Sequence, residues 1–325
     1  MASSQQPADQ PPPAPRGRYV GRFAPSPTGL LHFGSLVAAT ASYLAARQSG
    51  GTWLIRIEDI DSPREVPGSA DQIIGTLAAL GFQWNESIVR QSARIGLYER
   101  AAQRLIDEGT AFLCSCSRAE IAAGTPAPRT ADADELRYPG WCRAGVRHSD
   151  RPLAVRFRVS PGVTEFDDEV QGPLAVDVGA EVGDFVVRRR DGLFSYQLAV
   201  TVDDATQGIT HVVRGADLLR STPRQILLQR ALRLPTPTYA HVPLATDRNG
   251  IKLSKSAGAA AIDRQRPGHE LWRVLKFLRQ DPPPGLRLGN VATLWNWAIE
   301  HWAPAPLTGM TAAPVEDSTG GGLNK

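Results

Sequence analysis

Lysine, cysteine and methionine are scarce in this chain, whose 325 residues include 4 Lys, 3 Cys and 2 Met. Three cysteines cannot complete a disulfide framework. The first residues, MASSQQPADQ, lack the basic segment and the apolar stretch of a secretory signal. No uninterrupted apolar run reaches the roughly 18 residues that a membrane span needs. These shortages argue against a secreted disulfide scaffold and a membrane protein, and we expect a cytoplasmic protein.

Net charge is also small, because 36 basic residues stand against 33 acidic ones for a balance of +3. That balance does not by itself indicate a nucleic-acid partner. The basic residues are 32 Arg and 4 Lys, and Lys252 and Lys255 lie within the five-residue stretch KLSKS. A compact ammonium on a flexible stem differs chemically from the planar fork of arginine. Two lysines retained so close together are therefore candidates for functional residues.

The order of apolar segments predicts an α/β fold. A strand at Tyr19–Ala24, a helix at Leu36–Arg47 and a strand at Thr52–Ile57 form a βαβ beginning, which is typical of a parallel sheet. Alternation over Leu153–Val159 predicts a small antiparallel sheet. Strand and helix signals of the first kind return from Phe185 onward. The simplest interpretation is a doubly wound parallel domain interrupted by an insertion.

Composition divides the chain further. Residues 1–17 are rich in Pro, Ala and Gln and predict a disordered leader. The expected segments are the leader at 1–17, the first half of the parallel domain at 18–112, an inserted subdomain at 113–190, the second half at 191–260, a short helical segment at 261–310 and a disordered tail at 311–325.

The turn between the first strand and the first helix, RFAPSPTGLLHFGS at residues 22–35, is the first motif that could carry chemistry. Ligands bind at the carboxyl edge of a parallel sheet, and the start of a helix suits a phosphate. Gly34 would let a nucleotide approach the backbone, and His32 could donate a hydrogen bond to a phosphate oxygen. Taken alone, the motif equally fits a Pro/Gly-rich turn with a locally satisfied histidine.

The second motif, Lys252–Ser256, would by itself be a solvated basic loop. Together the two motifs resemble the paired signatures of class I aminoacyl-tRNA synthetases. The similarity to the glutamyl-tRNA synthetase family is closer still, because four blocks occur in that family's order. The blocks are RFAPSPTG at 22–29, RIEDID at 56–61, YQLA with VDD at 196–204, and VRGAD at 213–217.

This resemblance implies a pocket for L-glutamate, which carries two carboxylates and one ammonium. Arg22 and Arg214 would bind the carboxylates through their planar forks, and Glu58 would bind the ammonium. Ser26 and Tyr196 would supply hydroxyls. The resemblance also implies that a further group lines the pocket through its backbone: Phe23, Ala24 and Pro25. Without the order of the blocks, Glu58 would be an ordinary acidic strand end and Arg214 a surface arginine.

The chemistry implied is activation of glutamate by ATP, with Mg²⁺ accompanying the nucleotide. Lys255, helped by Lys252, would neutralise the charge that grows on the phosphates. His32 and Gly34 would contact ATP together with Lys255. The sequence departs from the family signature at two positions, because Phe33 replaces an aliphatic residue and Ser35 replaces the second histidine.

All three cysteines fall within a short span, as Cys114-Ser115-Cys116 and Tyr138-Pro-Gly-Trp-Cys142. Three thiolates and one further ligand would complete a tetrahedral Zn²⁺ site, with Tyr138 or a nearby histidine such as His148 as the fourth. Three free buried thiols are the alternative. The arrangement resembles the C-x-C…Y-x-x-x-C pattern of the glutamyl-Q tRNA(Asp) synthetase family, which implies one structural zinc with Tyr138 as its fourth ligand.

Only 69 residues follow Ser256, and we expect them to be too few for the anticodon-binding region of a glutamyl-tRNA synthetase. The resemblance then implies a monomer that attaches glutamate to the queuosine base in the anticodon loop of tRNA(Asp). A truncated enzyme that charges a tRNA 3′ end and a non-catalytic paralogue are the alternatives, and the intact lysine loop argues against the latter. The arginines that could follow RNA phosphates are Arg151, Arg156, Arg158, Arg188, Arg189 and Arg190, and an ordinary solvated surface is the alternative for each of them.

The resemblance also implies the fold class. It is a Rossmann-like doubly wound parallel sheet with an inserted zinc-containing α+β subdomain and a short helical C-terminal segment. L-glutamate, ATP and queuosine-bearing tRNA(Asp) are the expected partners, and no membrane is among them.

Overall fold

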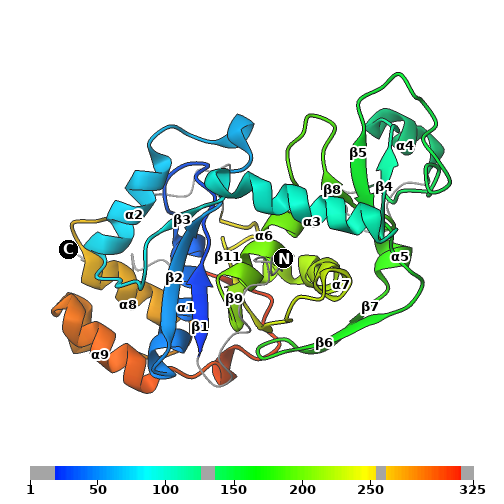
Figure 1. The fold of residues 1–325 in the computed structure, drawn as a ribbon. Helices are drawn as coiled ribbons and strands as arrows, with labels where there is room; N and C mark the ends of the chain where they lie inside the picture. Colours follow the sequence, from blue (N-terminus) through cyan, green and yellow to red (C-terminus); the bar gives the residue numbers. More distant parts are fainter. Residues whose placement is uncertain (1–18, 126–135, 254–260, 316–325) are drawn as a thin grey trace, which may run out of the picture.

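A parallel sheet built in two halves lies at the centre of the computed structural model, which describes residues 19–125, 136–253 and 261–315 (Figure 1). The first half contains β1 (Val20–Phe23), β2 (Thr52–Ile57) and β3 (Val89–Arg90), all parallel. Every residue of β2 is buried, as expected of a strand that is covered on both faces. The predicted bounds of this strand are confirmed.

Helix α1 (Phe33–Gln48) connects β1 to β2. It begins three residues before the predicted Leu36, because His32 caps it: the His32 Nδ1 accepts a hydrogen bond from the Ser35 amide. Side-chain acceptors at this position satisfy N–H groups that a helix start leaves free. The cap therefore sets where the helix begins, at the edge of the sheet.

The second half of the sheet contains β9 (His211–Gly215), β10 (Thr238–Val242) and β6 (Thr164–Asp168), with β10 between the other two and parallel to both. Strand β7 (Gly172–Val176) pairs antiparallel with β6. The two halves meet where β9 lies beside β1, and the Thr210 amide donates to the Val20 carbonyl at 2.9 Å. Chain order reverses there, which is where open α/β sheets bind ligands.

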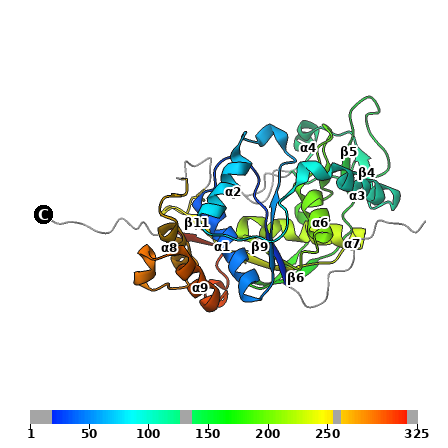
Figure 2. The same ribbon diagram turned by 60° about the vertical axis from the view of Figure 1, so that its left-hand side comes forward.

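Helices cover both sides of the sheet, and each side has its own hydrophobic core. One core joins α1 and β2 to α2 (Ser69–Ala79), α8 (Pro267–Phe277) and α9 (Val291–His301). The other joins α3 (Ile95–Asp107), α6 (Tyr196–Thr206) and α7 (Thr222–Leu232). Figure 2 shows α8 and α9 beside α1. Short 3₁₀ turns lie at Ser62–Arg64, Gln91–Arg94, Ala216–Ser221, Pro284–Leu288 and Ala305–Leu307.

The insertion has an antiparallel sheet of β4 (Ala111–Cys114), β5 (Ala154–Phe157) and β8 (Val186–Arg188), with the short helices α4 (Arg118–Gly124) and α5 (Val178–Glu181). The antiparallel sheet predicted from alternation is confirmed. The strand signal at Phe185 was expected to be of the parallel-sheet kind, which is wrong, because β8 pairs antiparallel with β5. The strand belongs to the insertion, within its predicted bounds of 113–190. A strand as short as β8 carries no periodicity that distinguishes the two sheets.

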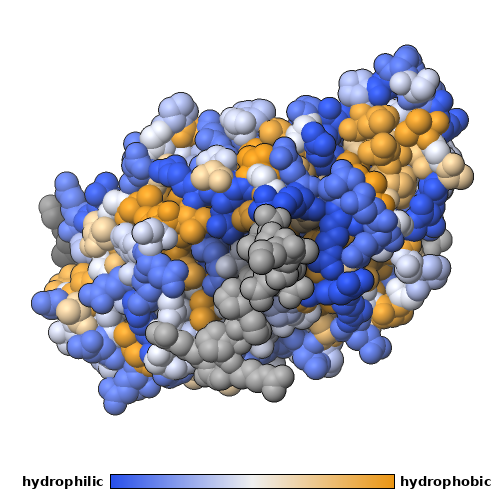
Figure 3. Space-filling model, in the orientation of Figure 1, coloured by the Kyte–Doolittle hydropathy of each residue, from blue (hydrophilic) through white to orange (hydrophobic). Residues whose placement is uncertain are grey.

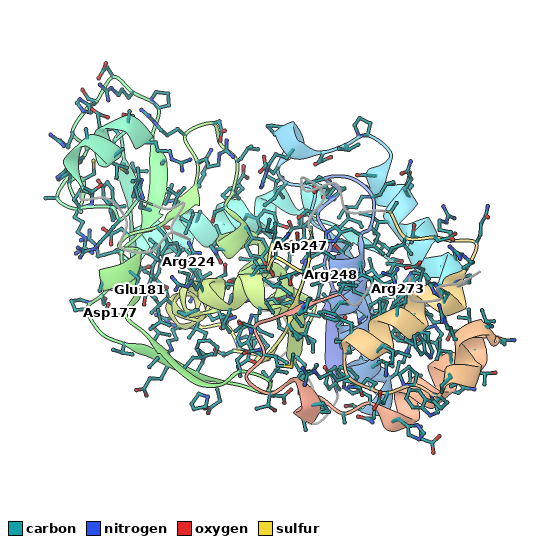
Figure 4. All side chains as sticks on the ribbon, turned by 180° about the vertical axis from the view of Figure 1, so that it is seen from behind. Asp177, Glu181, Arg224, Asp247, Arg248 and Arg273 are labelled. Atoms are coloured by element: carbon teal, nitrogen blue, oxygen red, sulfur yellow. The ribbon has the colours of Figure 1, made fainter. Side chains whose placement is uncertain are left out.

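Strand β6 also departs from the predicted division between the insertion and the parallel domain. It lies within the predicted insertion, yet it joins the parallel sheet, with Asp168 opposite Tyr239 of β10. The insertion therefore contributes two strands, β6 and β7, to the second half of the central sheet. Seen from behind, Asp177 and Glu181 of the insertion lie at the end of the molecule opposite Arg273 of α8 (Figure 4).

The predicted disordered tail at 311–325 is wrong in its first part. Strand β12 (Ala312–Pro314) pairs parallel with β11 (Leu244–Thr246), and the Val315 amide donates to Thr246 at 2.9 Å. Composition could not indicate a strand whose partner lies so far away in the sequence. Residues 316–325 and the leader at 1–17 lie outside the described residues. Among those described, no helix is both long and apolar enough to cross a bilayer.

Candidate active site

A cavity of about 1120 Å³ opens at the carboxyl ends of β1, β2 and β9. It exceeds the roughly 300–1,000 Å³ typical of one small-ligand site, so two ligands can lie in it side by side. The predicted glutamate and ATP residues among the described ones all line it: Arg22, Phe23, Ala24, Pro25, Ser26, His32, Gly34, Glu58, Tyr196, Arg214 and Lys252. Residues up to 230 positions apart in sequence therefore share one cavity, while the individual roles remain predictions.

Arg22, near the end of β1, is held by a buried ionic network. Its Nε lies 3.2 Å from the Asp204 Oδ1, and the Arg56 Nη2 lies 2.8 Å from that same oxygen. Arg22 is 3% exposed and Arg56 is fully buried. Buried charges are costly unless each has partners, and here each has one. The network fixes the Arg22 guanidinium at the wall of the cavity.

Glu58 follows β2 directly and is also buried. Burial raises the pKa of its carboxyl to about 7, although the nearby Arg56 and Arg22 lower it. The Arg56 Nη2 lies 3.4 Å from the Glu58 Oε1. An incoming ammonium would favour the ionised carboxylate. The Glu58 carboxyl can thus gain its negative charge when a cationic ligand binds.

Arg214, on β9, is held on two edges of its guanidinium. Its Nε donates to the His241 Nε2 at 2.9 Å, and its Nη2 donates to the Thr222 Oγ1 at 2.8 Å. The Nη1 donates to the Tyr196 hydroxyl at 3.3 Å. Burial raises the pKa of the Tyr196 phenol, which keeps the hydroxyl protonated. Of the partners Tyr196, His241 and Thr222, only Tyr196 lines the cavity, so the Nη1 edge of Arg214 lies on the cavity side.

The start of α1 forms the other end of the cavity. A Cβ on Gly34 would lie 3.3 Å from the His32 ring and 3.6 Å from the Leu253 carbonyl oxygen, so glycine fits this close approach. The His32 Nε2 lies 2.9 Å from the Ser35 hydroxyl. Because His32 Nδ1 accepts from the Ser35 amide, Nε2 carries the proton of a neutral ring. A phosphate contact from His32 would therefore require Nε2 to exchange Ser35 for the phosphate.

Lys252 also lines this end of the cavity, beyond a tight turn at Asp247–Gly250. Asp247 and Arg248 of the turn lie near the middle of the molecule in Figure 4. The Lys252 Nζ is 2.5 Å from the Asp217 Oδ2, and both side chains are exposed. Lys255, the predicted charge-neutralising lysine, lies outside the described residues.

The three cysteines form a buried cluster at the end of β4, with Sγ atoms within 4.8 Å of one another. The Tyr138 hydroxyl lies 3.4 Å from the Cys114 Sγ and 3.6 Å from the Cys116 Sγ, and it accepts from the Cys142 amide at 2.8 Å. His148, the alternative ligand, contacts Glu120 instead, with Nε2 3.0 Å from the carboxylate. Three thiols and a phenol converging in one place fit Zn²⁺.

Most of the arginines predicted to follow RNA are held by the insertion itself. The Arg156 Nε contacts the Cys114 Sγ at 3.4 Å, and Arg151 pairs with Glu120 at 2.9 Å. Arg190 donates to the carbonyls of Pro152 and Ser115. Arg158 and Arg188 lie over the rings of Phe112 and Phe194. Arg189 pairs with Asp191 at 2.6 Å, and it also lines the cavity.

The surface around these elements is mainly hydrophilic on the face drawn in Figure 3. An apolar patch lies over the insertion around α4 and β4, where Leu113 is exposed.

Two buried residues behind the cavity, Asp168 and His241, were missed in the sequence. His241 lies in the strand Thr238–Val242 and is fully buried. A histidine inside an otherwise apolar strand was the available signal, because a buried polar group needs a partner. Its partners come from β6 and β9, and no local pattern indicates that pairing.

The fold and the cavity together define a class I aminoacyl-tRNA synthetase catalytic domain. The family model described as "tRNA synthetases class I (E and Q), catalytic domain" matches residues 19–269. The glutamate-tRNA synthetase of Elizabethkingia anophelis superposes with a TM-score of 0.77 at 24% identity, over 92% of this chain and 68% of that one. A glutamate tRNA ligase of Elizabethkingia meningosepticum superposes with a TM-score of 0.75. These likenesses confirm the predicted α/β fold.

Curated relatives narrow the assignment. The glutamyl-Q tRNA(Asp) synthetase of Geobacter sulfurreducens is 51% identical over 94% of this chain and 99% of its own length. That of Dechloromonas aromatica is 54% identical over 87% of this chain and 94% of its own length. The chain belongs to the glutamyl-Q tRNA(Asp) synthetase family.

Proposed function

We propose that this protein activates L-glutamate with ATP and transfers the glutamyl group to the queuosine base in the anticodon loop of tRNA(Asp). One observation carries the proposal: a single cavity joins two buried arginines and a buried carboxylate to the start of a helix, in a chain of this family. The arginines and the carboxylate match the charges of glutamate. The helix start matches a nucleotide phosphate.

In the first step, an α-carboxylate oxygen of glutamate attacks the α-phosphorus of ATP. A new oxygen–phosphorus bond forms, the bond between that phosphorus and the pyrophosphate breaks, and pyrophosphate leaves. Arg22, Arg214 and Glu58 hold the amino acid, and Ser26 and Tyr196 orient it. Catalysis needs no protein nucleophile, because positioning and positive charge lower the barrier.

The nucleotide lies along the start of α1, with its phosphates near His32 and Gly34. Lys252 and Lys255 supply positive charge where negative charge grows on the phosphates. Mg²⁺ bound to the phosphate oxygens of ATP would neutralise their charge further. Such a site usually needs only one or two protein carboxylates. In the second step, the acceptor oxygen of the modified base attacks the glutamyl carbonyl carbon, and AMP leaves. A modified base in an unpaired loop can be turned outward to reach the cavity.

The test uses radiolabelled glutamate, ATP and unfractionated tRNA. We expect label on tRNA that contains queuosine, and no label on tRNA from cells that cannot make queuosine. Label on tRNA(Glu) that is attached to its 3′ adenosine would instead establish a conventional charging enzyme. Absence of pyrophosphate exchange with glutamate and ATP would establish a non-catalytic paralogue.

We also propose that Cys114, Cys116, Cys142 and Tyr138 hold one Zn²⁺, which would stabilise the insertion and take no part in the chemistry. The buried cluster and the position of the Tyr138 hydroxyl support this set. Four protein ligands would leave no open position for a substrate. The segment at 113–190 would then present Arg189 and the exposed face of the insertion toward the RNA.

Elemental analysis tests the zinc site. We expect about one zinc per chain, lost in Cys142→Ser and weakened in Tyr138→Phe, because a tetrahedral site needs all four ligands. His148→Ala is the matched control and should retain the metal. A metal-free protein that is folded and active would disprove the site. Zinc that is lost in His148→Ala but retained in Tyr138→Phe would show that His148, and not Tyr138, is the fourth ligand.

A further inference from the structure

Three buried side chains form a chain of hydrogen bonds behind the cavity. Asp168 ends β6, His241 lies on β10 and Arg214 lies on β9, and the three are 3%, 0% and 4% exposed. The Asp168 Oδ2 lies 2.5 Å from the His241 Nδ1, and the His241 Nε2 lies 2.9 Å from the Arg214 Nε. Three neighbouring strands therefore contribute to one continuous contact.

The chemistry of the donors determines where the proton on His241 lies. Arginine donates through all its N–H groups and cannot accept, so the His241 Nε2 must accept from Arg214. The proton is then on Nδ1, from which it is donated to Asp168. Burial lowers the pKa of His241 to about 4, against the influence of Asp168, so the ring is neutral.

Asp168 is itself fixed. Its Oδ1 accepts from the backbone amides of Val170, Gln171 and His241 at 3.0, 2.9 and 3.0 Å. Its Oδ2 is thereby directed at the histidine ring. The carboxylate can neither rotate nor exchange its two oxygens without breaking these bonds.

We propose that His241, fixed by Asp168, is a positioning residue for glutamate recognition: it holds the Arg214 Nε so that the Nη1 edge faces the cavity. The inference rests on the proposed function, in which Arg214 binds a glutamate carboxylate. Arginine has a long side chain, and holding it in one conformation costs entropy. A partner that binds Nε before substrate arrives removes that cost from binding.

The main test is Asp168→Asn, which keeps the volume of the side chain. The three backbone amides keep the amide oxygen on their side, so the amide NH₂ faces His241. Two donors cannot face each other, so Nδ1 must become the acceptor and Nε2 must carry the proton. That proton opposes the Arg214 Nε–H. Proton–nitrogen NMR of ¹⁵N-histidine-labelled protein, with the His241 signals assigned from His241→Gln, should show the change of tautomer.

Pyrophosphate exchange supplies the functional readout. In Asp168→Asn we expect the KM for glutamate to rise about tenfold or more, with the KM for ATP unchanged, because one hydrogen bond to a charged group is lost. The matched control is Asp167→Asn, which makes the same chemical change at an exposed position on the same strand. In this control, the His241 tautomer and the KM values for glutamate and ATP should equal those of the wild type.

Rescue by a conservative residue separates positioning from general stability. His241→Gln keeps an oxygen acceptor for the Arg214 Nε and should leave the KM for glutamate within about threefold of the wild type. His241→Leu removes the acceptor and should raise that KM about tenfold or more, because it leaves a buried donor unpaired. Melting curves establish that each variant is folded.

Equal rises in the KM values for glutamate and ATP would overturn the proposal, as would a changed tautomer with an unchanged KM for glutamate. The tautomer does not depend on activity. Wild-type protein that shows the Nδ1–H tautomer but no exchange with glutamate would therefore overturn the proposed function while leaving the hydrogen-bond chain intact.

Discussion

The two ends of the cavity hold their cations in opposite ways. At the glutamate end, Arg22 and Arg214 are at most 4% exposed, and each is bound to a buried acceptor. At the nucleotide end, the side chain of Lys252 is 45% exposed and pairs with a carboxylate that is 38% exposed. A preorganised fork suits a small substrate whose charges do not move. A flexible ammonium suits phosphates whose charge shifts during reaction.

The rigidity of the glutamate end depends on two buried carboxylates, Asp203 and Asp204, that do not line the cavity. Asp203 is fully buried and accepts from Gln91, Arg94 and Tyr98, while Arg56 lies 3.7 Å away. This carboxylate helps to compensate the buried Arg56, which in turn contacts Asp204 beside Arg22. Charge in the glutamate end is therefore balanced over two layers of residues.

The largest loss of activity should follow removal of an arginine from the glutamate end of the cavity. Arg22→Ala should raise the KM for glutamate about 100-fold or more, because truncating one partner of a buried charge pair costs about 2–5 kcal/mol. The KM for ATP should change little. Pyrophosphate exchange measures both.

Arg230→Ala, at an exposed position of α7, is the control and should match the wild type. Arg22→Lys should recover only part of the loss, since a point charge does not reproduce a planar fork. A full recovery would show that charge alone is needed at the glutamate end, and the contrast between the two ends would fail.

Next in size is Lys255→Ala, which removes the lysine predicted to act on the phosphates. We expect kcat of activation to fall about 100-fold, because the ammonium acts on charge that develops in the transition state. Glutamate affinity, measured by calorimetry, should be nearly unchanged. Lys276→Ala is the matched control, because that lysine is on α8 and pairs with Asp281. Equal losses in kcat and glutamate affinity would contradict the assigned role.

The sequence predicted the residues of the cavity better than the contacts that hold them. Short blocks such as RIEDID are contiguous, so Glu58 could be recognised from its neighbours in the chain. His241 and Asp168 are 73 positions apart and meet only because β6 lies beside β10. Local patterns carry no information on such pairing, which also explains why β12 was missed and β8 was placed in the wrong sheet.

A smaller effect should come from pH, through Glu58. Burial raises the pKa of this carboxyl to about 7, so the empty cavity holds a proton below that pH. Glutamate binding requires the ionised carboxylate of Glu58. Below pH 7, the affinity for glutamate should therefore decrease with falling pH, at a rate that approaches about tenfold per pH unit, and above pH 7 it should be constant. Calorimetry in buffers of different ionisation enthalpy should detect proton release.

Glu58→Gln should bind glutamate weakly and with little dependence on pH in that range. The linked effect on folding has the opposite sense, because a raised carboxyl pKa favours the folded state at low pH. The contribution of Glu58 to the free energy of unfolding should decline as pH rises from about 4.5 to about 7. Glutamate affinity that stays constant below pH 7 would show that the ammonium binds elsewhere.

The smallest effect is expected for Asp217→Asn, which removes the partner of Lys252. Both side chains are substantially exposed, and such pairs contribute about 0–1 kcal/mol. Melting temperature should hardly change, and the KM for ATP should stay within about threefold of the wild type. Raising the salt concentration should reduce even this difference, because exposed charges are screened.

Gly215→Ala is unsuitable as a control, since its Cβ would lie 2.7 Å from the Asp217 carboxylate. Asp281→Asn removes the partner of the other paired lysine and serves instead. A tenfold or larger rise in the KM for ATP in Asp217→Asn alone, about 1.4 kcal/mol, would mean that Asp217 positions Lys252 as firmly as His241 is proposed to position Arg214. The two ends of the cavity would then follow the same principle.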